Sequence, residues 1–381
     1  MTLGVIPARG GSKGVPRKNL REVLGKPLIY WSIKAAAESA LLDDFVVSTE
    51  DAEIARVARS FGAKVLKRPQ RLASDETTTL SVLRHVLEHF RADTLAVLQP
   101  TSPIRDGELV DACLKRFRKK KANSLATGYY CKFLEYGSHN NLRRQDYKGF
   151  FYDDGNVYVV DAGTVLAGRW TGDVVERYLL DGDYNFEIDT ELDLFIVEKL
   201  MEKRLVDGLK NAPKPVRLLA LDVDGVLTDA GMYYTDAGEA MKKFNTRDGK
   251  GLELLRKRGF KTAFITAEET GIVERRAQKL LVDFLHQGVK DKLPVLRGIA
   301  RKMRISLDQV AYVGDDVNDL SVLKEVGFAA TPSNGCIEAK RIAHYVCRKA
   351  GGAGCVREVC DLILSALERE PDPSRKKALT R

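Results

Sequence analysis

The chain has 381 residues, of which 44% are hydrophobic and 30% charged, and it carries a formal net charge of +9. This length exceeds one ordinary core and predicts two domains, while the composition excludes a disordered or membrane-spanning class. Met1 leads straight into a predicted strand rather than a signal peptide, so we expect a cytoplasmic protein, with nuclear import open in a eukaryotic host.

The positive charge raises the question of nucleic-acid binding. The densest basic run, Arg116–Lys121, falls at the end of a predicted helix, where basic side chains stabilise the helix dipole. No aromatic stacking pattern accompanies it, so we predict anionic small-molecule substrates, no nucleic-acid partner and no membrane partner. The 6 cysteines show neither a C-x-x-C pair nor zinc spacing and are predicted to be reduced and structural.

The first half alternates short apolar strands with amphipathic helices. Predicted strands are 3–6, 45–48, 64–66, 95–98 and 124–127, and predicted helices are 28–41, 52–61, 80–90 and 109–118. This alternation predicts an α/β domain with a mainly parallel sheet flanked by helices, of the Rossmann-like type. Ligands bind beyond the carboxyl ends of such strands.

The loop after the first predicted strand, within IPARGGSKGVPRKNL (6–20), is suited to binding a polyphosphate. Its three glycines (10, 11 and 14) allow the backbone to approach an anion closely, and Arg9, Lys13 and Lys18 supply positive charge. The spacing fits neither a Walker loop nor a dinucleotide-binding fingerprint. The loop is therefore predicted to hold a polyphosphate in another way.

Later segments set the domain boundaries. Between residues 132 and 161 the alternation breaks, and we expect an excursion from the sheet that includes an oligomer contact. Residues 211–216 read as a linker between a first domain, 1–210, and a second α/β domain, 217–381, which opens with the apolar strand 217–221.

A metal pair precedes that linker. In FEIDTELDL, Glu187 and Asp189 are two apart, so an extended backbone places both carboxylates on one face, where they can hold Mg²⁺. Asp193 either assists or caps the helix that begins there.

Six segments of the first domain together resemble the CMP-sialic acid synthetases. IPARGGSKGVPRKNL, VSTEDAEI, KRPQRLASD, LQPTSP, RRQD and EIDTELDL occur in the family order over roughly residues 3 to 205. The resemblance implies attack by the anomeric hydroxyl of a sialic acid on the α-phosphorus of CTP, with Mg²⁺ at Glu187 and Asp189 and Lys18 as a catalytic residue. The residues implied for CTP are Arg9, Gly11, Ser12, Lys13, Lys18, Asn19, Arg68 and Thr79. Those implied for the sugar are Gln99, Thr101, Ser102, Arg144 and Gln145, with Arg144 reaching across a dimer.

Two positions depart from the family pattern. Glu187 stands where the family metal pair usually begins with Asp, and Asp154 stands where an Asn is usual before Gly155. The longer side chain of Glu187 must be accommodated at the metal. The anion at 154 is expected to affect which sugar is accepted.

The second domain places acidic and phosphate-binding residues at successive strand ends. Asp222 and Asp224 follow strand 217–221, Thr266 follows 261–265, Asp315 follows 310–313, and Lys292 lies between them. The set resembles the haloacid-dehalogenase-type phosphatases, closest to their Kdo-8-phosphate and KDN-9-phosphate branch. The resemblance implies Asp222 as nucleophile, Asp224 as acid and base, Thr266 and Lys292 on the phosphoryl group, and Mg²⁺ at Asp222, Asp224 and Asp315. Glu268 is implied in sugar recognition.

The short insertions of this domain leave no room for a large cap, so the site is expected to be covered by another subunit. The segment 351–354 resembles the intersubunit tail of that branch, and we expect a tetramer assembled through residues beyond 215. The leading hypothesis is a bifunctional enzyme that dephosphorylates a sialic acid 9-phosphate and couples the free sugar to CMP. The alternatives are a second domain that only oligomerises, and a sugar that is Kdo, legionaminic or pseudaminic acid.

Overall fold

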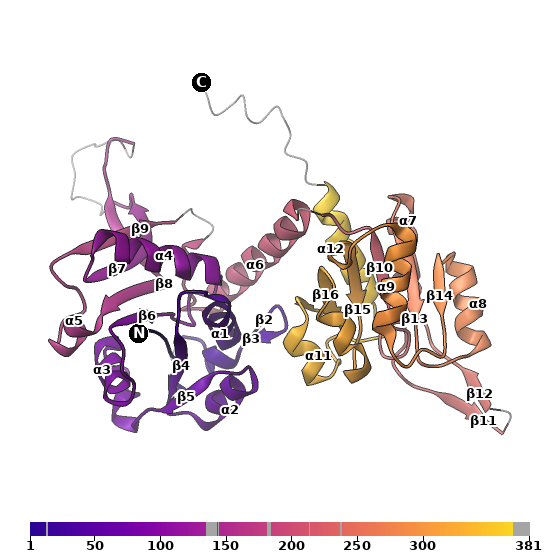
Figure 1. Ribbon diagram of the computed structural model, residues 1–381, viewed down its shortest axis with the longest axis horizontal. Coiled ribbons are helices and arrows are strands. Elements are labelled where there is room, and N and C mark those ends of the chain that lie inside the picture. The colour runs from indigo at the N-terminus through magenta and orange to yellow at the C-terminus, as the bar shows by residue number, and fades with distance from the viewer. Residues whose placement is uncertain are drawn as a thin grey trace. The chain divides into compact units, whose positions relative to one another are not determined.

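The computed structural model describes residues 1–12, 14–134, 143, 145–180, 184–212, 214–236 and 238–368. The chain divides into two compact units, Met1–Met201 and Glu202–Arg381, and the division falls inside helix α6 (Glu191–Asn211). The predicted linker begins at the last residue of this helix. Each unit is an α/β fold with its own sheet, as the sequence predicts (Figure 1).

The first unit contains a seven-stranded sheet in the order β5-β4-β1-β6-β8-β7-β9. Its strands are β1 (Thr2–Pro7), β4 (Asp44–Thr49), β5 (Lys64–Lys67), β6 (Thr94–Val97), β7 (Ser124–Cys131), β8 (Phe150–Asp161) and β9 (Val175–Leu179). Strand β1 pairs in parallel with β4 and β6, and its Leu3, Val5 and Ile6 are fully buried. Two short strands, β2 (Glu22–Val23) and β3 (Lys26–Pro27), form a separate hairpin.

In the described residues of this unit, the α-helices besides α6 are α1 (Leu28–Glu38), α2 (Ala52–Ser60), α3 (Thr79–His89), α4 (Gly107–Lys120) and α5 (Ala162–Leu166). Side chains that precede three of them accept hydrogen bonds from the first turn: Asp51 caps α2, Thr78 caps α3 and Asp106 caps α4. The basic run begins within the last turns of α4, and Lys121 ends that helix in the left-handed conformation. The predicted helices and parallel strands of this domain are thus confirmed within a few residues.

The expected excursion from the sheet is wrong for residues 150–161. These residues form β8, a 12-residue strand between β6 and β7 and antiparallel to both, so the sheet is mixed. Burial explains the strand, because Val157 and Val159 are fully buried in the core. Polar Asp153 and Asp154 interrupt the apolar alternation and obscure the strand in the sequence.

The second unit contains a six-stranded parallel sheet in the order β14-β13-β10-β15-β16-β17. Its strands are β10 (Leu218–Leu221), β13 (Lys261–Ile265), β14 (Phe284–His286), β15 (Val310–Val313), β16 (Phe328–Thr331) and β17 (Tyr345–Val346). The helices are α7 (Thr246–Lys257), α8 (Gly271–Leu280), α9 (Lys292–Met303), α10 (Leu320–Leu323), α11 (Ile337–Ile342) and α12 (Cys355–Glu368). A hairpin of β11 (Tyr233–Thr235) and β12 (Gly238–Met241) extends away from this sheet (Figure 1).

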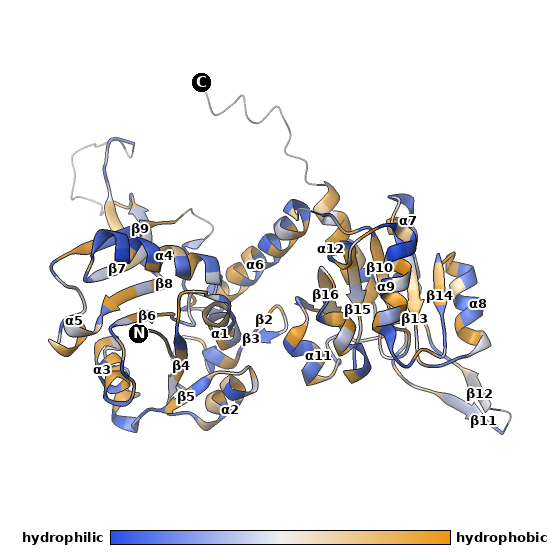
Figure 2. Ribbon diagram, viewed as in Figure 1, coloured by the Kyte–Doolittle hydropathy of each residue, from blue (hydrophilic) through white to orange (hydrophobic). Residues whose placement is uncertain are grey.

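Hydropathy follows the layers of each unit. Strands such as β10 and β13 are mainly hydrophobic, whereas helices such as α4 and α8 carry hydrophilic residues (Figure 2). Within the part of the chain that the structure describes, no helix is both long and apolar enough to cross a membrane.

Candidate active sites

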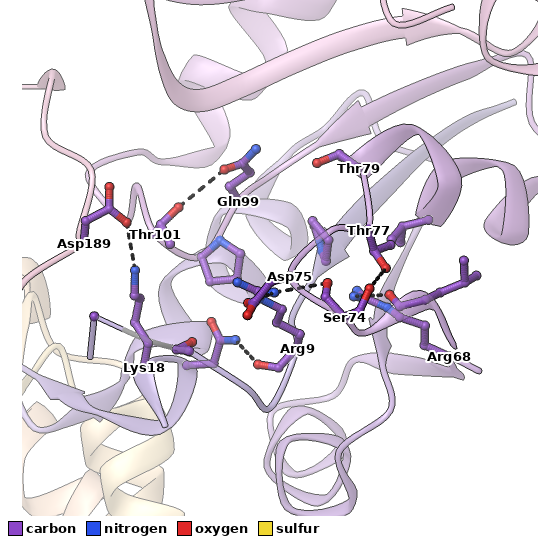
Figure 3. Close-up of a pocket in the computed structure, with 17 residues that line it drawn as sticks. Arg9, Lys18, Arg68, Ser74, Asp75, Thr77, Thr79, Gln99, Thr101 and Asp189 are labelled. Carbon is purple, nitrogen blue, oxygen red and sulfur yellow. Dashed lines mark hydrogen bonds and ion pairs between the residues drawn. The ribbon is translucent and has the colours of Figure 1, made fainter. Parts of the chain in front are cut away.

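A cavity of about 430 Å³ lies at the carboxyl ends of β1 and β6 in the first unit. Three cationic side chains, Arg9, Lys18 and Arg68, line it together with Asp189 (Figure 3). Its other lining residues are Pro7, Ser12, Gly14, Asn19, Leu72, Ser74, Asp75, Thr77, Thr79, Val82, Gln99, Pro100 and Thr101. The predicted CTP residues therefore meet in one cavity, except Gly11, which does not line it, and Lys13, which lies outside the described residues.

The loop after β1 is fixed by neighbouring backbone and carboxylates. A Cβ on Gly14 would lie 2.0 Å from the Asp189 carbonyl oxygen, so only glycine fits there. Gly10 donates its N–H to Glu50 Oε1 at 2.6 Å, and Asn19 Nδ2 donates to the Arg9 carbonyl at 2.8 Å. The N–H of Gly10 is therefore engaged by a carboxylate and does not point freely into the cavity.

The three cationic side chains of the cavity have different hydrogen-bond and ion-pair partners. Arg68 is 4% exposed and donates to the carbonyl of Ser48 at 2.6 Å. Burial lowers the pKa of Arg68 to about 10, which still leaves it charged at neutral pH. Arg9 pairs with Asp75 at 2.7 Å, and Lys18 Nζ contacts Asp189 Oδ1 at 3.1 Å and the Ile188 carbonyl. These groups concentrate positive charge where a polyphosphate would bind.

The predicted metal pair lies beside this charge. Glu187 Oε1 accepts a hydrogen bond from Thr101 Oγ1 at 3.0 Å, and Asp189 pairs with Lys18. Desolvation raises the pKa of Glu187, and the charge of Asp189 adds to the rise. Two carboxylates of this kind are suitable ligands for Mg²⁺, whose charge would favour their ionised forms. Asp193 instead accepts from the backbone N–H of Thr190 at 2.7 Å and caps the start of α6.

Only some of the residues predicted to bind the sugar line the cavity. Gln99 and Thr101 line the cavity, whereas Ser102 is fully buried and donates to the Asp154 carbonyl at 2.8 Å. Gln145 is exposed and is not among the cavity-lining residues, and Arg144 lies outside the described residues. Asp154 is 3% exposed, and its Oδ1 accepts from Thr127 Oγ1 at 2.6 Å. This departure from the family pattern therefore sits in the packing behind the cavity.

Arg105 is a supporting residue that the sequence reasoning missed. It is 6% exposed and donates to the carbonyls of Gln99, Ser102 and Asn156 at 2.5, 2.7 and 2.6 Å. Burial lowers the pKa of Arg105 to about 9. The guanidinium joins the loop after β6 to strand β8. Its signal in the sequence is an isolated arginine directly before the capping residue of α4.

The second unit holds a buried lysine between two carboxylates. Lys292 Nζ lies 2.9 Å from Asp222 Oδ1 and 2.8 Å from Asp319 Oδ1, and Tyr312 donates its hydroxyl to Asp319 at 2.6 Å. Burial opposes the charge of Lys292, but the two carboxylates outweigh it and raise its pKa. Asp222 and Lys292 were predicted from the sequence, whereas the roles of Asp319 and Tyr312 were not.

Asp222, Asp315 and Asp319 form a cluster whose ligand oxygens all lie within 4.8 Å of one another. Desolvation, and then the charge of Asp319, raise the pKa of Asp222 and of Asp315 to about 7. Among the residues that the structure describes, the buried Asp315 Oδ1 has no hydrogen-bond partner. An orphaned carboxylate oxygen beside two others fits a hard divalent cation such as Mg²⁺.

The other predicted residues of the second unit surround this cluster in different ways. The carboxylate of Asp224 does not belong to the cluster but pairs with Lys242 at 2.6 Å, whereas Asp319, which was not predicted as a ligand, does belong to it. Thr266 is 1% exposed at the end of β13, and Glu268 is exposed two residues later.

The turn 351–354 packs within its own chain. A Cβ on Gly351 would lie 1.8 Å from the Gly225 carbonyl oxygen, and Gly352 donates its N–H to the Val226 carbonyl at 3.0 Å. This segment therefore packs against the turn after Asp222 in the same unit. Its predicted contact between subunits stays a prediction.

Comparisons with known proteins match both halves of the chain. The sequence profile of the cytidylyltransferase family matches residues 3–160, and that of haloacid dehalogenase-like hydrolases matches residues 260–358. N-acylneuraminate cytidylyltransferase A of Danio rerio is 31% identical over 379 residues, which cover 94% of this chain and 88% of that protein.

Two phosphatases match the second part alone. The 3-deoxy-D-manno-octulosonate 8-phosphate phosphatase of Escherichia coli K12 is 42% identical over 151 residues, covering 40% of this chain and 80% of that protein. A crystal structure of the Moraxella catarrhalis phosphatase of the same name, with magnesium, phosphate and Kdo, is 35% identical with a TM-score of 0.41. It covers 48% of this chain and 98% of that chain.

Proposed function

The chain belongs to the N-acylneuraminate cytidylyltransferase family, and from this membership we propose that it carries out two reactions on one kind of sugar. The first unit transfers CMP from CTP to a sialic acid, either KDN or N-acetylneuraminate, and releases pyrophosphate. The second unit removes the phosphate from the corresponding sialic acid 9-phosphate. The proposal is supported by the cationic cavity of the first unit and by the buried Asp222–Lys292–Asp319 group of the second.

In the first unit, the oxygen of the sugar's anomeric hydroxyl loses its proton to water and forms a bond to the α-phosphorus of CTP, while the bond from that phosphorus to the oxygen shared with the β-phosphate breaks. Lys18, Arg9 and Arg68 surround the cavity and offset the charge on the phosphate oxygens. Gln99 and Thr101 line the side of the cavity next to Glu187 and are proposed to orient the sugar. Mg²⁺ held by Glu187 and Asp189 would stabilise the departing pyrophosphate.

In the second unit, an Asp222 carboxylate oxygen attacks the phosphorus, and the sugar oxygen leaves with a proton from Asp224. Water then cleaves the aspartyl-phosphate and regenerates Asp222. Lys292 favours the ionised form of Asp222, and Thr266 is positioned at the neighbouring strand end. Mg²⁺ bound by Asp222, Asp315 and Asp319 would neutralise the phosphoryl charge.

The two reactions are consecutive, because the product of the second unit is the acceptor of the first. The names of the matching phosphatases support this assignment, since 3-deoxy-D-manno-octulosonate 8-phosphate is also a sugar acid with a terminal phosphate. A fused pair of domains that acts on successive forms of one sugar acid has a chemical rationale.

We also propose that the chain assembles as a tetramer built from synthetase dimers. In the second unit the hairpin β11–β12 exposes apolar side chains, with Tyr234 66% and Met241 60% exposed. In the first unit Tyr130, Phe150 and Tyr152 of β7 and β8 are each about half exposed. Exposed apolar surfaces of this kind are typical of protein interfaces.

The experiment that tests the two activities separates pyrophosphate release from phosphate release. The protein is incubated with CTP, Mg²⁺ and KDN or N-acetylneuraminate, with or without a 9-phosphate, and both products are quantified. Asp222→Asn is expected to abolish phosphate release while CMP transfer stays near normal. Lys18→Met is expected to abolish CMP transfer while phosphate release stays near normal, and Lys34→Met, at a half-buried lysine of α1, serves as its control.

The alternative that the second unit only oligomerises predicts a different result. If the second unit only oligomerises, no phosphate is expected to be released from any nonulosonic acid phosphate. Alternatively, Asp222→Asn is expected to impair CMP transfer and to change the oligomeric state at the same time. A sugar panel that includes Kdo and legionaminic and pseudaminic acids decides the acceptor, because only the preferred sugar gives pyrophosphate at low concentration.

A further inference from the structure

A second cluster of side chains that could hold a metal ion lies on helix α3. Among the residues that the structure describes, two groups of acidic, histidine or cysteine side chains bring three ligand atoms within 4.8 Å of one another. One is the phosphatase carboxylate cluster, and the other is His85, Glu88 and His89. We propose that His85, Glu88 and His89 bind a transition-metal cation of the Zn²⁺ type.

The spacing of these residues suits a site on one helix face. Positions i, i+3 and i+4 of a helix are neighbours, so both imidazoles and the carboxylate project from adjacent positions. The ring centroids of His85 and His89 are 4.6 Å apart. Zn²⁺ takes nitrogen and carboxylate ligands at about 2.0–2.2 Å, and two histidines with one glutamate leave a fourth position for water. Glu88 and His89 are exposed, so small side-chain rotations can close the remaining distance.

The ring nitrogens are in a state suited to metal binding. His89 Nδ1 lies 2.9 Å from the His85 carbonyl oxygen, which can only accept, so Nδ1 carries the proton and the Nε2 lone pair is left for a metal. His85 is only 6% exposed, and within the described part of the chain its buried Nδ1 has no hydrogen-bond partner. A buried ring nitrogen without a partner is unfavourable, and a bound cation would provide the missing contact.

The surrounding charges explain why the carboxylate is needed. Burial, and then the neighbouring His89, lower the pKa of His85, because both disfavour the charged imidazolium. Arg68 and Arg71 also lower this pKa, and they oppose any cation bound nearby. Glu88 is the carboxylate in the cluster that offsets them. None of the three ligands lines the CTP cavity, so the site is separate from the nucleotide.

The test is a Zn²⁺ titration of the metal-stripped, full-length chain without a histidine tag, against a chromophoric chelator. Excess Mg²⁺ is present to occupy the carboxylate sites. The wild type is expected to bind one more equivalent of Zn²⁺ than His89→Gln, whose affinity at this site falls at least tenfold. Glu88→Gln is expected to weaken the same site severalfold. His286→Gln, at an exposed histidine of the second unit, is the matched control and is expected to bind like the wild type.

A spectroscopic measurement locates the site independently. Co²⁺ bound by two imidazoles and a carboxylate gives visible absorption bands, which are expected in the wild type and in His286→Gln and absent in His89→Gln. Both variants change exposed side chains, so retention of fold is expected and is checked by CMP transfer and circular dichroism. Equal Zn²⁺ stoichiometry and affinity in His89→Gln and His286→Gln, or Co²⁺ bands that persist in His89→Gln, would overturn the proposal.

Discussion

Lys292 is a fully buried ammonium group whose neighbours are two carboxylates, Asp222 and Asp319. Lys292→Met leaves these two anions facing each other without a cation. Because breaking a buried ion pair on one side costs about 3–5 kcal/mol, we expect a loss of that size in the second unit. Lys290→Met removes an exposed lysine two residues away and is expected to change stability by less than about 0.5 kcal/mol. Scanning calorimetry of the two variants makes the comparison, and equal losses would contradict the assigned role of Lys292.

The acidic cluster predicts a dependence of stability on pH. Without a bound cation, the pKa of Asp222 and of Asp315 rises from 3.8 to about 7. The folded unit therefore binds more protons than the unfolded chain between these values, and its stability falls as pH rises from about 4 to about 7. Each group contributes a slope of up to about 1.4 kcal/mol per pH unit.

Thermal unfolding in a chelator, at a series of pH values, measures this slope. Asp315→Asn is expected to reduce it, because the titrating carboxyl is gone. Saturating Mg²⁺ is expected to remove most of it, since the cation binds the ionised carboxylates. A slope that is the same in Asp315→Asn and in the wild type would rule out this origin.

At the scale of the element, the turn after β10 depends on the absence of a side chain at Gly225. This residue has φ +85°, and a Cβ there would lie 1.9 Å from Asp315 Oδ2. Gly225→Ala is expected to displace Asp315 and lower phosphate release at least a hundredfold. Gly259 has nearly the same φ, +84°, but open space around it. Gly259→Ala therefore reports the backbone strain alone, and similar phosphate release in both variants would argue against the contact with Asp315.

Arg105 connects two elements around the first cavity. Arg105→Met leaves the carbonyls of Gln99, Ser102 and Asn156 without their donor, and we expect a loss of about 2–4 kcal/mol with weaker CMP transfer. Arg105→Lys is expected to recover little, because one ammonium group cannot reproduce a planar fork of donors. Urea unfolding and initial rates measure both effects. Full recovery of stability and of the rate of CMP transfer in Arg105→Lys would show that only the positive charge at this position is required.

These features show which parts of the fold and of the two sites could be predicted from the sequence. Alternating apolar runs predicted β1, β4, β10 and β15, and the residues that follow them form both sites, because parallel strands bring their carboxyl ends to one edge. Strand β8 was missed because Asp153 and Asp154 interrupt its apolar pattern. Asp319 and Arg105 were missed because their roles depend on partners distant in the sequence, such as Lys292 and Asn156. Local patterns carry no information about such contacts.

At the scale of the whole molecule, the exposed apolar hairpin predicts how the chain assembles. Replacing Tyr234 and Met241 together by serine removes two side chains that are 66% and 60% exposed. We expect the proposed tetramer to dissociate into dimers, because β7 and β8, the strands proposed for the synthetase contact, lie outside this hairpin. Ile337→Ser, at a side chain that is 50% exposed in the same unit, is the control. Sedimentation velocity distinguishes the species, and an unchanged tetramer in the hairpin variant would exclude this surface.

The packing of Gly351 and Gly352 against the turn that contains Gly225 and Val226 has a consequence for biosynthesis. The ribosome makes the chain from its N-terminus, so this turn emerges long before the glycines that support it. At about 5–20 residues per second, the delay is on the order of ten seconds. The strands of the first unit have been synthesised before Gly351 is added, so this unit can fold before the second unit is complete. The nascent chain is therefore expected to form the site of its first unit before that of its second, and a chain that ended before Gly351 would lack this support for the turn after Asp222.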